Sequence, residues 1–350
     1  MKTKLNSAKR HARIMLWSAV IIVFGAMILP LTSYVYTDWV SAKAAAAQDA
    51  NPRANYWRAV REGGPGYTAA SGPYTTNVLI QNGGQYWRQL RNGPVANYTP
   101  WILAVVVVVL GLFYLIKGPQ KVEGPISGQT VARWNLGERV LHWYTATLFI
   151  ILSITGLSLL FGRAVLIPIL GLQGFSAWAD LAIALHNYLG PFFVAGVLIE
   201  LLAWIRFNIP NSTDWTWLKK AGGMFSGKHV SAGRSNGGEK VWYWIIATFG
   251  VAVCVTGLIL DFPNFEQSRE TMQLMNIIHG IAGVIWVAIS LGHIYLGLIG
   301  SEGALQGMTR GRVSVEWAKQ HHDLWYEEVK STATIEAGKT APGGAAKQPS

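Results

Sequence analysis

Four histidines of this sequence lie within long apolar stretches: His142, His186, His279 and His293. An ionisable side chain in a segment long enough to cross a membrane is costly, so it normally has a partner or a function. Each ring taken alone is consistent with a hydrogen-bonded core histidine or with a proton relay. Taken together, the four indicate a different chemistry, because neutral imidazoles are common ligands of haem iron.

The spacing of the last two histidines is the first reason for this interpretation. His279 and His293 are 14 residues apart in one apolar segment. In a helix that offset returns to within roughly 40° of the same face, at an axial distance of about 21 Å. One helix would therefore present one imidazole near each surface of a bilayer, both on the same face.

The other two histidines supply the matching partners. His142 lies at the start of a segment that enters from the side where His293 lies, and His186 starts a segment that enters from the opposite side. The pattern predicts two haems b, each held by two imidazoles. His142 and His293 are the expected ligands of the inner iron, and His186 and His279 those of the outer iron.

The composition supports a membrane protein that could position these rings. Of 350 residues, 51% are hydrophobic and only 13% are charged, and 16 Trp and 13 Tyr are present. Such rings collect at membrane interfaces, and about 20 apolar residues cross the hydrocarbon core. Segments of suitable or nearly suitable length are Ile14–Tyr36, Trp101–Ile116, Val140–Phe161, Leu181–Phe207, Val241–Phe262 and Ile277–Gly300. We expect an all-α integral membrane protein: a four-helix di-haem cytochrome b bundle plus one or two extra N-terminal transmembrane helices.

The distribution of basic residues predicts the orientation. The net charge is +11, and Lys and Arg gather between the second and third segments, between the fourth and fifth, and after the last. The loops 162–180 and 263–275 contain one basic residue each, Arg163 and Arg269. By the positive-inside rule the basic loops and the C-terminus are cytoplasmic, in a bacterial inner membrane.

The N-terminal part is expected to contain three regions. Residues 1–47 read either as a cleaved signal peptide or as an anchor helix, because a basic start and an apolar run precede small residues. Residues 48–99 form an exported, periplasmic region rich in Gly, Pro and Trp, in which Tyr-Trp-Arg occurs twice with a second Arg three residues later. This repeat fits an amphipathic pair on the membrane surface or a docking site for a partner. Residues 100–117 form the extra transmembrane helix.

The rest of the chain is expected to contain the membrane bundle, a cytoplasmic segment and a tail. Residues 130–310 form the four-helix di-haem domain, and residues 311–330 a cytoplasmic segment that contacts the membrane or a partner. That segment includes His321 and His322, for which the sequence offers no third metal ligand. Residues 331–350 read as a disordered tail.

The chain lacks the means to oxidise a substrate by itself. Its single cysteine, Cys254, lies in an apolar run, so neither a disulfide framework nor a cysteine-ligated iron–sulfur cluster is available. It also has no nucleotide-binding fingerprint. An electron donor and an acceptor must come from elsewhere, and a quinone dissolved in the lipid is the natural acceptor of two electrons and two protons.

Residues 130–330 resemble the gamma subunits, cytochrome b556, of membrane-bound respiratory formate dehydrogenases. The matching motifs are Arg139-Val-Leu-His142-Trp143, Leu185-His186 with Gly190-Pro-Phe-Phe193, Asn208-Ile-Pro210, Asn236-Gly-Gly-Glu-Lys240, the His279/His293 pair and Trp317 to Tyr326. The resemblance implies the same haem pairing, an iron–sulfur beta subunit and a molybdopterin alpha subunit as partners, and formate:quinone oxidoreductase activity in the assembled complex. The extra residues before the matching part depart from the shortest family members.

The resemblance also implies a quinone site beside the inner haem, formed by Asn236, Gly238 and His293. An amide can donate to a quinone carbonyl, and a glycine permits close approach of a ligand. The alternative is that Asn236 and Gly238 only form a turn and a helix N-terminus.

Two rival functions remain open at the level of sequence. One is the cytochrome b subunit of a nickel–iron hydrogenase or of another periplasmic dehydrogenase, since these share the haem histidines. The other is a haem-free transporter that uses its histidines as a proton relay.

Overall fold

The structure, a computed structural model, describes residues 57–58, 60–62, 82–227, 229–263, 265 and 267–335. Contacts between Cα atoms divide the chain into two compact units. Unit 1 comprises Met1–Val107, Ile151–Gly190 and Ala252–Ile285, and unit 2 comprises Val108–Ile150, Pro191–Val251 and Trp286–Ser350. The expected N-terminal segment Ile14–Tyr36, and with it the choice between signal peptide and anchor, lies outside the described residues.

The described residues contain five helices that are long and apolar enough to cross a membrane. They are Gly83–Lys117, Leu136–Val165, Ile167–Asn208, Gly237–Asp261 and Arg269–Gly300. Each covers one of the segments expected from hydropathy, except that Phe262 falls just beyond its helix, and the helical fold class is confirmed. The helices are longer than the apolar runs, because polar residues at their ends continue or cap the helical turns.

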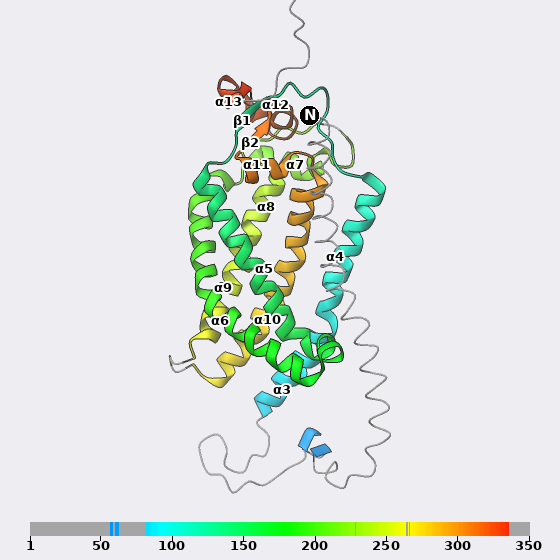
Figure 1. The fold of residues 1–350 in the computed structure, drawn as a ribbon, viewed down its shortest axis with the longest axis vertical. Coiled ribbons are helices and arrows are strands. Elements are labelled where there is room, and N and C mark those ends of the chain that lie inside the picture. The colour runs from blue at the N-terminus through cyan, green and yellow to red at the C-terminus, as the bar shows by residue number, and fades with distance from the viewer. Residues whose placement is uncertain are drawn as a thin grey trace, which may run out of the picture. The chain divides into compact units, whose positions relative to one another are not determined.

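Unit 1 consists of helices and parts of helices. These are α3 (Asn82–Leu90), the π-helical turn η2 (Arg91–Val95), the start of α4 (Ala96–Lys117), the later half of α5 (Leu136–Val165), the earlier part of α6 (Ile167–Asn208), nearly all of α9 (Val251–Asp261) and most of α10 (Arg269–Tyr295) (Figure 1). Residues 162–180, expected as a loop, are mostly helical. The break is at Gly171, whose φ of 69° lies outside the helical region.

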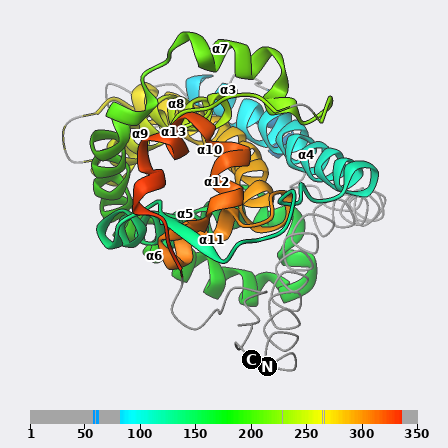
Figure 2. The ribbon, with the colours of Figure 1, turned by 90° about the horizontal axis from the view of Figure 1, so that it is seen from above.

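Unit 2 holds the remaining parts of α4, α5, α6 and α10 together with shorter elements. These are β1 (Gln129–Ala132), α7 (Ser212–Lys219), η3 (Ala221–Gly223), α8 (Gly237–Ile245), η4 (Ile246–Gly250), η5 (Leu296–Gly300), α11 (Ala304–Arg310), β2 (Arg312–Ser314), α12 (Val315–His321), α13 (Asp323–Val329), η6 (Lys330–Thr332) and β3 (Thr334–Ile335). Helix α7 lies across the outer side of the first turn of α8 (Figure 2).

Reciprocal capping explains where three of these helices begin. The Asn135 side chain accepts from the amide of Glu138 at 2.9 Å, and the Glu138 carboxylate accepts from the amide of Asn135 at 2.8 Å. Asn236 and Glu239 form the same arrangement at the start of α8, as do Asn211 and Asp214 at the start of α7. Each box satisfies amides that the helix leaves unpaired, so these polar residues fix the ends of α5, α7 and α8.

A small antiparallel sheet and a hydrophobic cluster order the C-terminal segment. The strand order is β2-β1-β3, and Val131 pairs with Val313. These two valines and Trp325, each at most 2% exposed, join the cluster with Val315, Trp317 and Ala318. Much of the segment 311–330 therefore packs against its own chain. Of the tail, residues 334–335 form β3, and residues 336–350 lie outside the described part of the chain.

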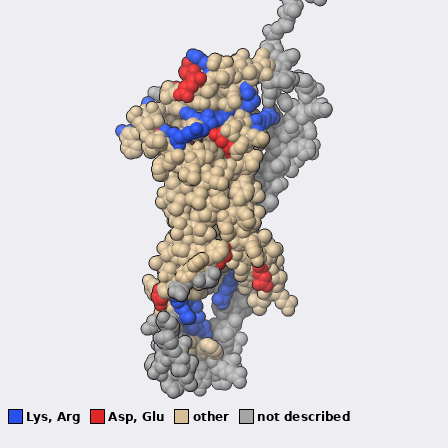
Figure 3. Space-filling model, turned by 90° about the vertical axis from the view of Figure 1, so that its left-hand side faces the viewer, with Lys and Arg blue, Asp and Glu red and all other residues tan. Residues whose placement is uncertain are grey.

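The surface of unit 2 separates charged from apolar side chains. Lys and Arg, with fewer Asp and Glu, gather over its loops, its small sheet and α7 (Figure 3). Many large apolar side chains of its transmembrane helices are exposed, for example Ile150 at 49% and Leu202 at 77%. Such a surface fits contact with lipid, so the chain is an integral membrane protein.

Candidate haem sites

In unit 1 the structure brings together the first pair of expected ligands. The rings of His186 on α6 and His279 on α10 have centroids 6.0 Å apart, with an angle of 79° between their planes. Both rings are therefore placed so that one atom of each can approach a common point between them.

Threonine hydroxyls from two other helices hold these rings. Thr155 Oγ1 on α5 lies 2.9 Å from His186 Nδ1, and Thr256 Oγ1 on α9 lies 3.1 Å from His279 Nδ1. Each hydroxyl can give its only hydrogen to its own helix, from Thr155 to the carbonyl of Ile151 at 2.9 Å and from Thr256 to the carbonyl of Ala252 at 2.6 Å. Each threonine oxygen then accepts a hydrogen bond from the ring.

The carbonyl of Val253 fixes the tautomer of His279. It lies 3.1 Å from the Nδ1 atom of that ring and can only accept, so Nδ1 carries the hydrogen. The other nitrogen, Nε2, then keeps its lone pair for a metal. Thr155 can accept from Nδ1 of His186 when its own hydrogen goes to the carbonyl of Ile151, and such outer hydrogen bonds are typical of histidines that bind metals.

A glycine next to each threonine makes room for the ring. A Cβ atom on Gly156 would lie 3.1 Å from Cε1 of His186, and one on Gly257 would lie 3.1 Å from Cε1 of His279. Both distances are shorter than nearly all contacts that real Cβ atoms make. The dipeptides Thr155-Gly156 and Thr256-Gly257 thus form matching cradles for the two rings.

Unit 2 brings together the second pair. The ring centroids of His142 on α5 and His293 on α10 are 6.3 Å apart, with an angle of 53° between the planes. His293 stacks on Trp242 of α8 at 4.6 Å and 8°, and His142 meets the edge of Trp143 at 5.2 Å. Nδ1 of His142 is buried without a hydrogen-bond partner among the described residues.

Both separations fit two imidazoles on one iron. A bond of about 2 Å from iron to each ring nitrogen, plus roughly 1 Å from that nitrogen to the ring centre, places the two centroids about 6 Å apart. The observed 6.0 Å and 6.3 Å agree with this value. Histidine nitrogens are also the donor set expected for haem iron.

Comparison with known proteins agrees with this geometry. The sequence model of a family described as "Prokaryotic cytochrome b561" matches residues 133–311, just over half of the chain, and this range includes all four histidines. The chain belongs to the prokaryotic cytochrome b561 family. Membership of a cytochrome b family implies haem b as the cofactor.

Individual relatives cover the same part of the chain. The "Formate dehydrogenase, cytochrome b556(fdo) subunit" of Escherichia coli (strain K12) is 31% identical over 212 residues, 59% of this chain and 97% of the relative. The "Formate dehydrogenase, nitrate-inducible, cytochrome b556(Fdn) subunit" of the same strain is 27% identical over 205 residues, 57% and 92%. The "Formate dehydrogenase, cytochrome b556 subunit" of Haemophilus influenzae (strain KW20 / Rd) is 30% identical over 211 residues, 58% and 85%.

Within this cytochrome b561 chain, two of the three residues expected at a quinone site, Asn236 and Gly238, lie at the start of α8. Asn236 is the N-cap, and its side-chain oxygen accepts from the amide of Glu239 at 2.9 Å. A Cβ atom on Gly238 would lie 2.9 Å from the indole of Trp217, so its lack of a side chain already serves packing. Both features belong to the helix-start alternative, but the amide nitrogen of Asn236 remains able to donate to a ligand.

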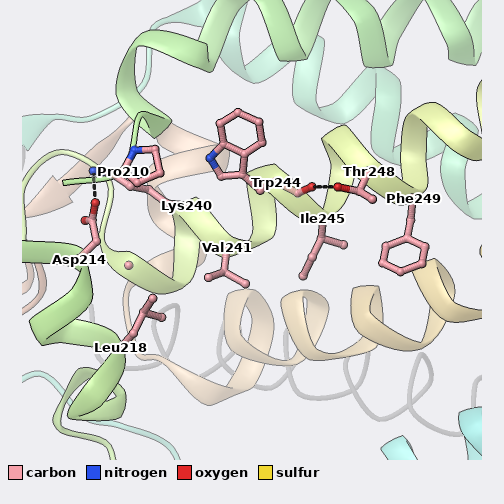
Figure 4. Close-up of a pocket in the computed structure, with 10 residues that line it drawn as sticks. Pro210, Asp214, Leu218, Lys240, Val241, Trp244, Ile245, Thr248 and Phe249 are labelled. Carbon is pink, nitrogen blue, oxygen red and sulfur yellow. Dashed lines mark hydrogen bonds and ion pairs between the residues drawn. The ribbon is translucent and has the colours of Figure 1, made fainter. Parts of the chain in front are cut away.

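A cavity of about 330 Å³ follows one face of α8 (Figure 4). Lys240 and Asp214 line it, and they are bonded to each other at 2.7 Å, so its polar groups are already paired. Its apolar lining includes Val241, Trp244 and Ile245. Trp242, which stacks on His293, is not part of that lining, so the cavity and the His142/His293 pair lie on different faces of α8.

Unit 2 also contains a buried network of charged and polar side chains. The Arg133 guanidinium is 3.2 Å from Glu239 Oε1 and 3.2 Å from His322 Nε2, while His322 Nδ1 donates to the carbonyl of Gly233 at 2.8 Å. Burial, and then the charge of Arg133, lower the pKa of His322 well below its ordinary value. Only 1% of His322 is exposed, so this residue packs inside its own chain rather than facing the membrane or a partner.

Sequence reasoning missed several residues of these sites. Thr155 and Thr256 stand in the repeated pattern Ile154-Thr-Gly-Leu157 and Val255-Thr-Gly-Leu258, which is a signal in the sequence. Outside these sites, sequence reasoning also missed Glu200, a buried acid 6% exposed on α6. Trp242 gave no such signal, because stacking partners depend on the tertiary fold.

Proposed function

We propose that this chain is the membrane cytochrome b subunit of a formate dehydrogenase, carrying electrons through two haems b to quinone. The observation that carries the proposal is the pair of imidazole sites with ring separations of 6.0 Å and 6.3 Å, one in each unit. The relatives named as formate dehydrogenase cytochrome b556 subunits supply the choice of complex.

The residues of the chain have defined tasks in this proposal. His186 and His279 bind the outer haem iron through Nε2, and His142 and His293 bind the inner one. When bound, each haem supplies a one-electron couple. The protein orients the ligands, keeps water from them and sets the potential.

The direction of electron flow follows from the proposed topology. Most described basic loop residues belong to unit 2, for example Lys121, Lys220 and Arg234, which favours a cytoplasmic position for the inner pair. Helix α10 carries one histidine of each pair and so links the two sites along the chain. Moving one electron inward against 100 mV costs about 2.3 kcal/mol, so the inner haem must have the higher potential.

Quinone reduction is proposed beside the inner haem. The Oδ1 atom of Asn236 already accepts from Glu239, so its amide nitrogen is the group that would donate to a quinone carbonyl. Gly238 and His293 would complete the wall of the site. The quinone takes two electrons and, with two protons from the cytoplasm, becomes quinol.

The proposed partners supply the formate oxidation and the iron–sulfur clusters for which this chain has no residues. A molybdopterin alpha subunit would oxidise formate in the periplasm, and an iron–sulfur beta subunit would pass the electrons to the outer haem. Lipid of the bacterial inner membrane surrounds the helices. Alone, the chain would not oxidise formate.

The rival functions make different demands on the histidines. A proton relay needs a ring that exchanges hydrogen between its two nitrogens, whereas Nδ1 of His279 is held by two acceptors, Thr256 and Val253. A hydrogenase cytochrome b subunit would need the same haem sites, so the partner and the electron donor must separate it from this proposal.

The test is purification of the intact complex from membranes in mild detergent. We expect two haems b per chain in a pyridine haemochromogen assay, co-purification of a molybdopterin subunit, and haem reduction by formate but not by hydrogen. Reduction by hydrogen with a nickel–iron partner would support the rival complex. Absence of haem from the pure, folded chain would overturn the assignment as an electron carrier.

A further inference from the structure

We propose that Thr155 and Thr256 set the potential of the outer haem below that of the inner haem, and so give the electron its downhill step. The inference rests on the proposed function, because it concerns the haem that His186 and His279 would hold. It assigns a positioning and tuning role to two residues that bind neither iron nor substrate.

The first step of the argument is the direction of the hydrogen bonds. Thr155 and Thr256 hydroxyls can donate to carbonyls of their own helices at 2.9 Å and 2.6 Å, and they then accept from the ring nitrogens. An imidazole whose Nδ1 hydrogen is held by an acceptor becomes a more basic ligand at Nε2. More basic ligands stabilise ferric over ferrous iron, which lowers the potential.

The second step is that the effect acts on both ligands of one iron. Thr155 holds His186 at 2.9 Å, Thr256 holds His279 at 3.1 Å, and the carbonyl of Val253 adds a further acceptor to His279 at 3.1 Å. The two hydroxyls are held in place on α5 and α9, because each is itself bonded to a carbonyl of its own helix. The rings therefore keep one tautomer and one orientation.

The third step is the contrast with unit 2. Nδ1 of His142 is buried without a hydrogen-bond partner among the described residues. Trp242, which covers His293, presents a ring face rather than a strong acceptor. The ligand that lacks a strong acceptor is the less basic one, so the inner iron should favour the ferrous state more than the outer iron does.

The flanking glycines support a built site rather than a chance contact. Gly156 and Gly257 let the rings approach to a distance at which any Cβ atom would be tight, 3.1 Å from Cε1 in both cases. The same dipeptide thus supplies the acceptor and the space, once from α5 and once from α9.

The test is a spectroscopic redox titration of the purified complex with Thr155→Val and Thr256→Val, separately and together. Valine keeps the shape and removes the acceptor. We expect each change to raise the reduction potential of the outer haem, so that its ferric-to-ferrous equilibrium constant falls severalfold. The potential of the inner haem should not change. A tenfold loss corresponds to about 59 mV for one electron.

Two controls separate tuning from packing. Ser158→Ala removes a hydroxyl of the same helix α5 that donates to the carbonyl of Ile154 at 2.6 Å, and it should shift neither haem potential. Thr155→Ser and Thr256→Ser keep the hydroxyl and should restore values near those of the wild type. If a valine variant loses the outer haem and the serine variant retains it, the acceptor role is also supported.

The result that would overturn the inference is a valine variant that keeps both haems at unchanged potentials. Equal shifts from serine and valine would also overturn it, because packing alone would then explain them. A complex whose wild type holds no haem would instead contradict the proposed function, so the two failures are distinguishable.

Discussion

The two histidine pairs have almost the same separation but different surroundings. In unit 1, ring nitrogens of His186 and His279 are bonded to threonine hydroxyls that are themselves bonded to their helices. In unit 2, His293 lies against the face of Trp242, and Nδ1 of His142 has no partner in the described part of the chain. The spacing of ligands suits one kind of cofactor at both sites, whereas the surrounding groups distinguish one site from the other.

The unit 2 site also differs because a network of buried polar residues lies near the start of α8. Glu239, in the first turn of α8, takes part in a capping box and approaches Arg133. Arg133 in turn bonds to His322. The His142/His293 site thus adjoins helix starts and buried charges, which is compatible with the quinone reduction proposed there.

The largest expected effect comes from removing one ligand of either pair. His186→Ala or His279→Ala should remove the outer haem and halve the haem content, and His142→Ala or His293→Ala should do the same for the inner haem. The reason is that a site with one imidazole instead of two binds the haem iron much more weakly. Haem content per chain measures this, with the partly exposed His229→Ala as control. Loss of both haems from a folded, abundant variant would contradict independent sites.

A second change separates the two roles of Asn236. Serine at this position keeps the N-cap but removes the amide donor, whereas alanine removes both, at about 1 kcal/mol of helix stability. We expect Asn236→Ser to keep the stability of the wild type and to raise the KM for quinone about two- to tenfold, the value of one hydrogen bond. Steady-state quinone reduction measures this. A normal KM in Asn236→Ser would leave the asparagine with capping alone.

The buried network should make stability depend on pH. Because burial and Arg133 lower the folded-state pKa of His322, the unfolded chain binds the proton first as pH falls below about 6.5. Stability should therefore fall from about pH 6.5 downward, by up to about 1.4 kcal/mol per pH unit for this residue. Burial lowers the pKa of His321 to about 4, so it adds to the same window.

Thermal unfolding of the detergent-solubilised protein between pH 7.5 and pH 5 checks this dependence. His322→Gln should reduce the slope, because glutamine does not take up a proton in this range. An equal slope in His322→Gln would mean that other groups control stability in acid.

The smallest expected effect concerns the stacking ring of unit 2. Trp242→Leu removes a contact worth about 0.5–1.5 kcal/mol and should change the electron paramagnetic resonance signal of the inner haem alone, since the orientation of His293 is less restricted. Trp244→Leu is the matched control, because that ring lines the cavity on the other face of α8. A change in the outer signal would show that the two sites are not independent.

Sequence alone predicted which histidines lie together, because their positions follow from one helical repeat. His279 and His293 share a face by spacing, and the direction of the apolar segments then selects His186 and His142 as partners. The residues around these histidines were harder to predict from the sequence. Thr155 and Thr256 contact their histidines from other helices, and the repeated Thr-Gly dipeptide is the only signal for them in the sequence.

The C-terminal segment shows why other parts could not be predicted. β1 and β2 have three or four residues each and pair Val131 with Val313, 182 positions apart. His322 is buried because Arg133, 189 positions earlier, lies against it. Such short strands and distant contacts leave no periodic pattern in the sequence, so a surface segment was the natural expectation.

The central claim is that two irons are each held by two imidazole nitrogens from this chain. The most direct measurement is an experimental density map of the purified complex at side-chain resolution. We predict two macrocycles, one between His186 and His279 and one between His142 and His293, each bound through Nε2. A single macrocycle, or an iron bound by any other residue, would contradict it.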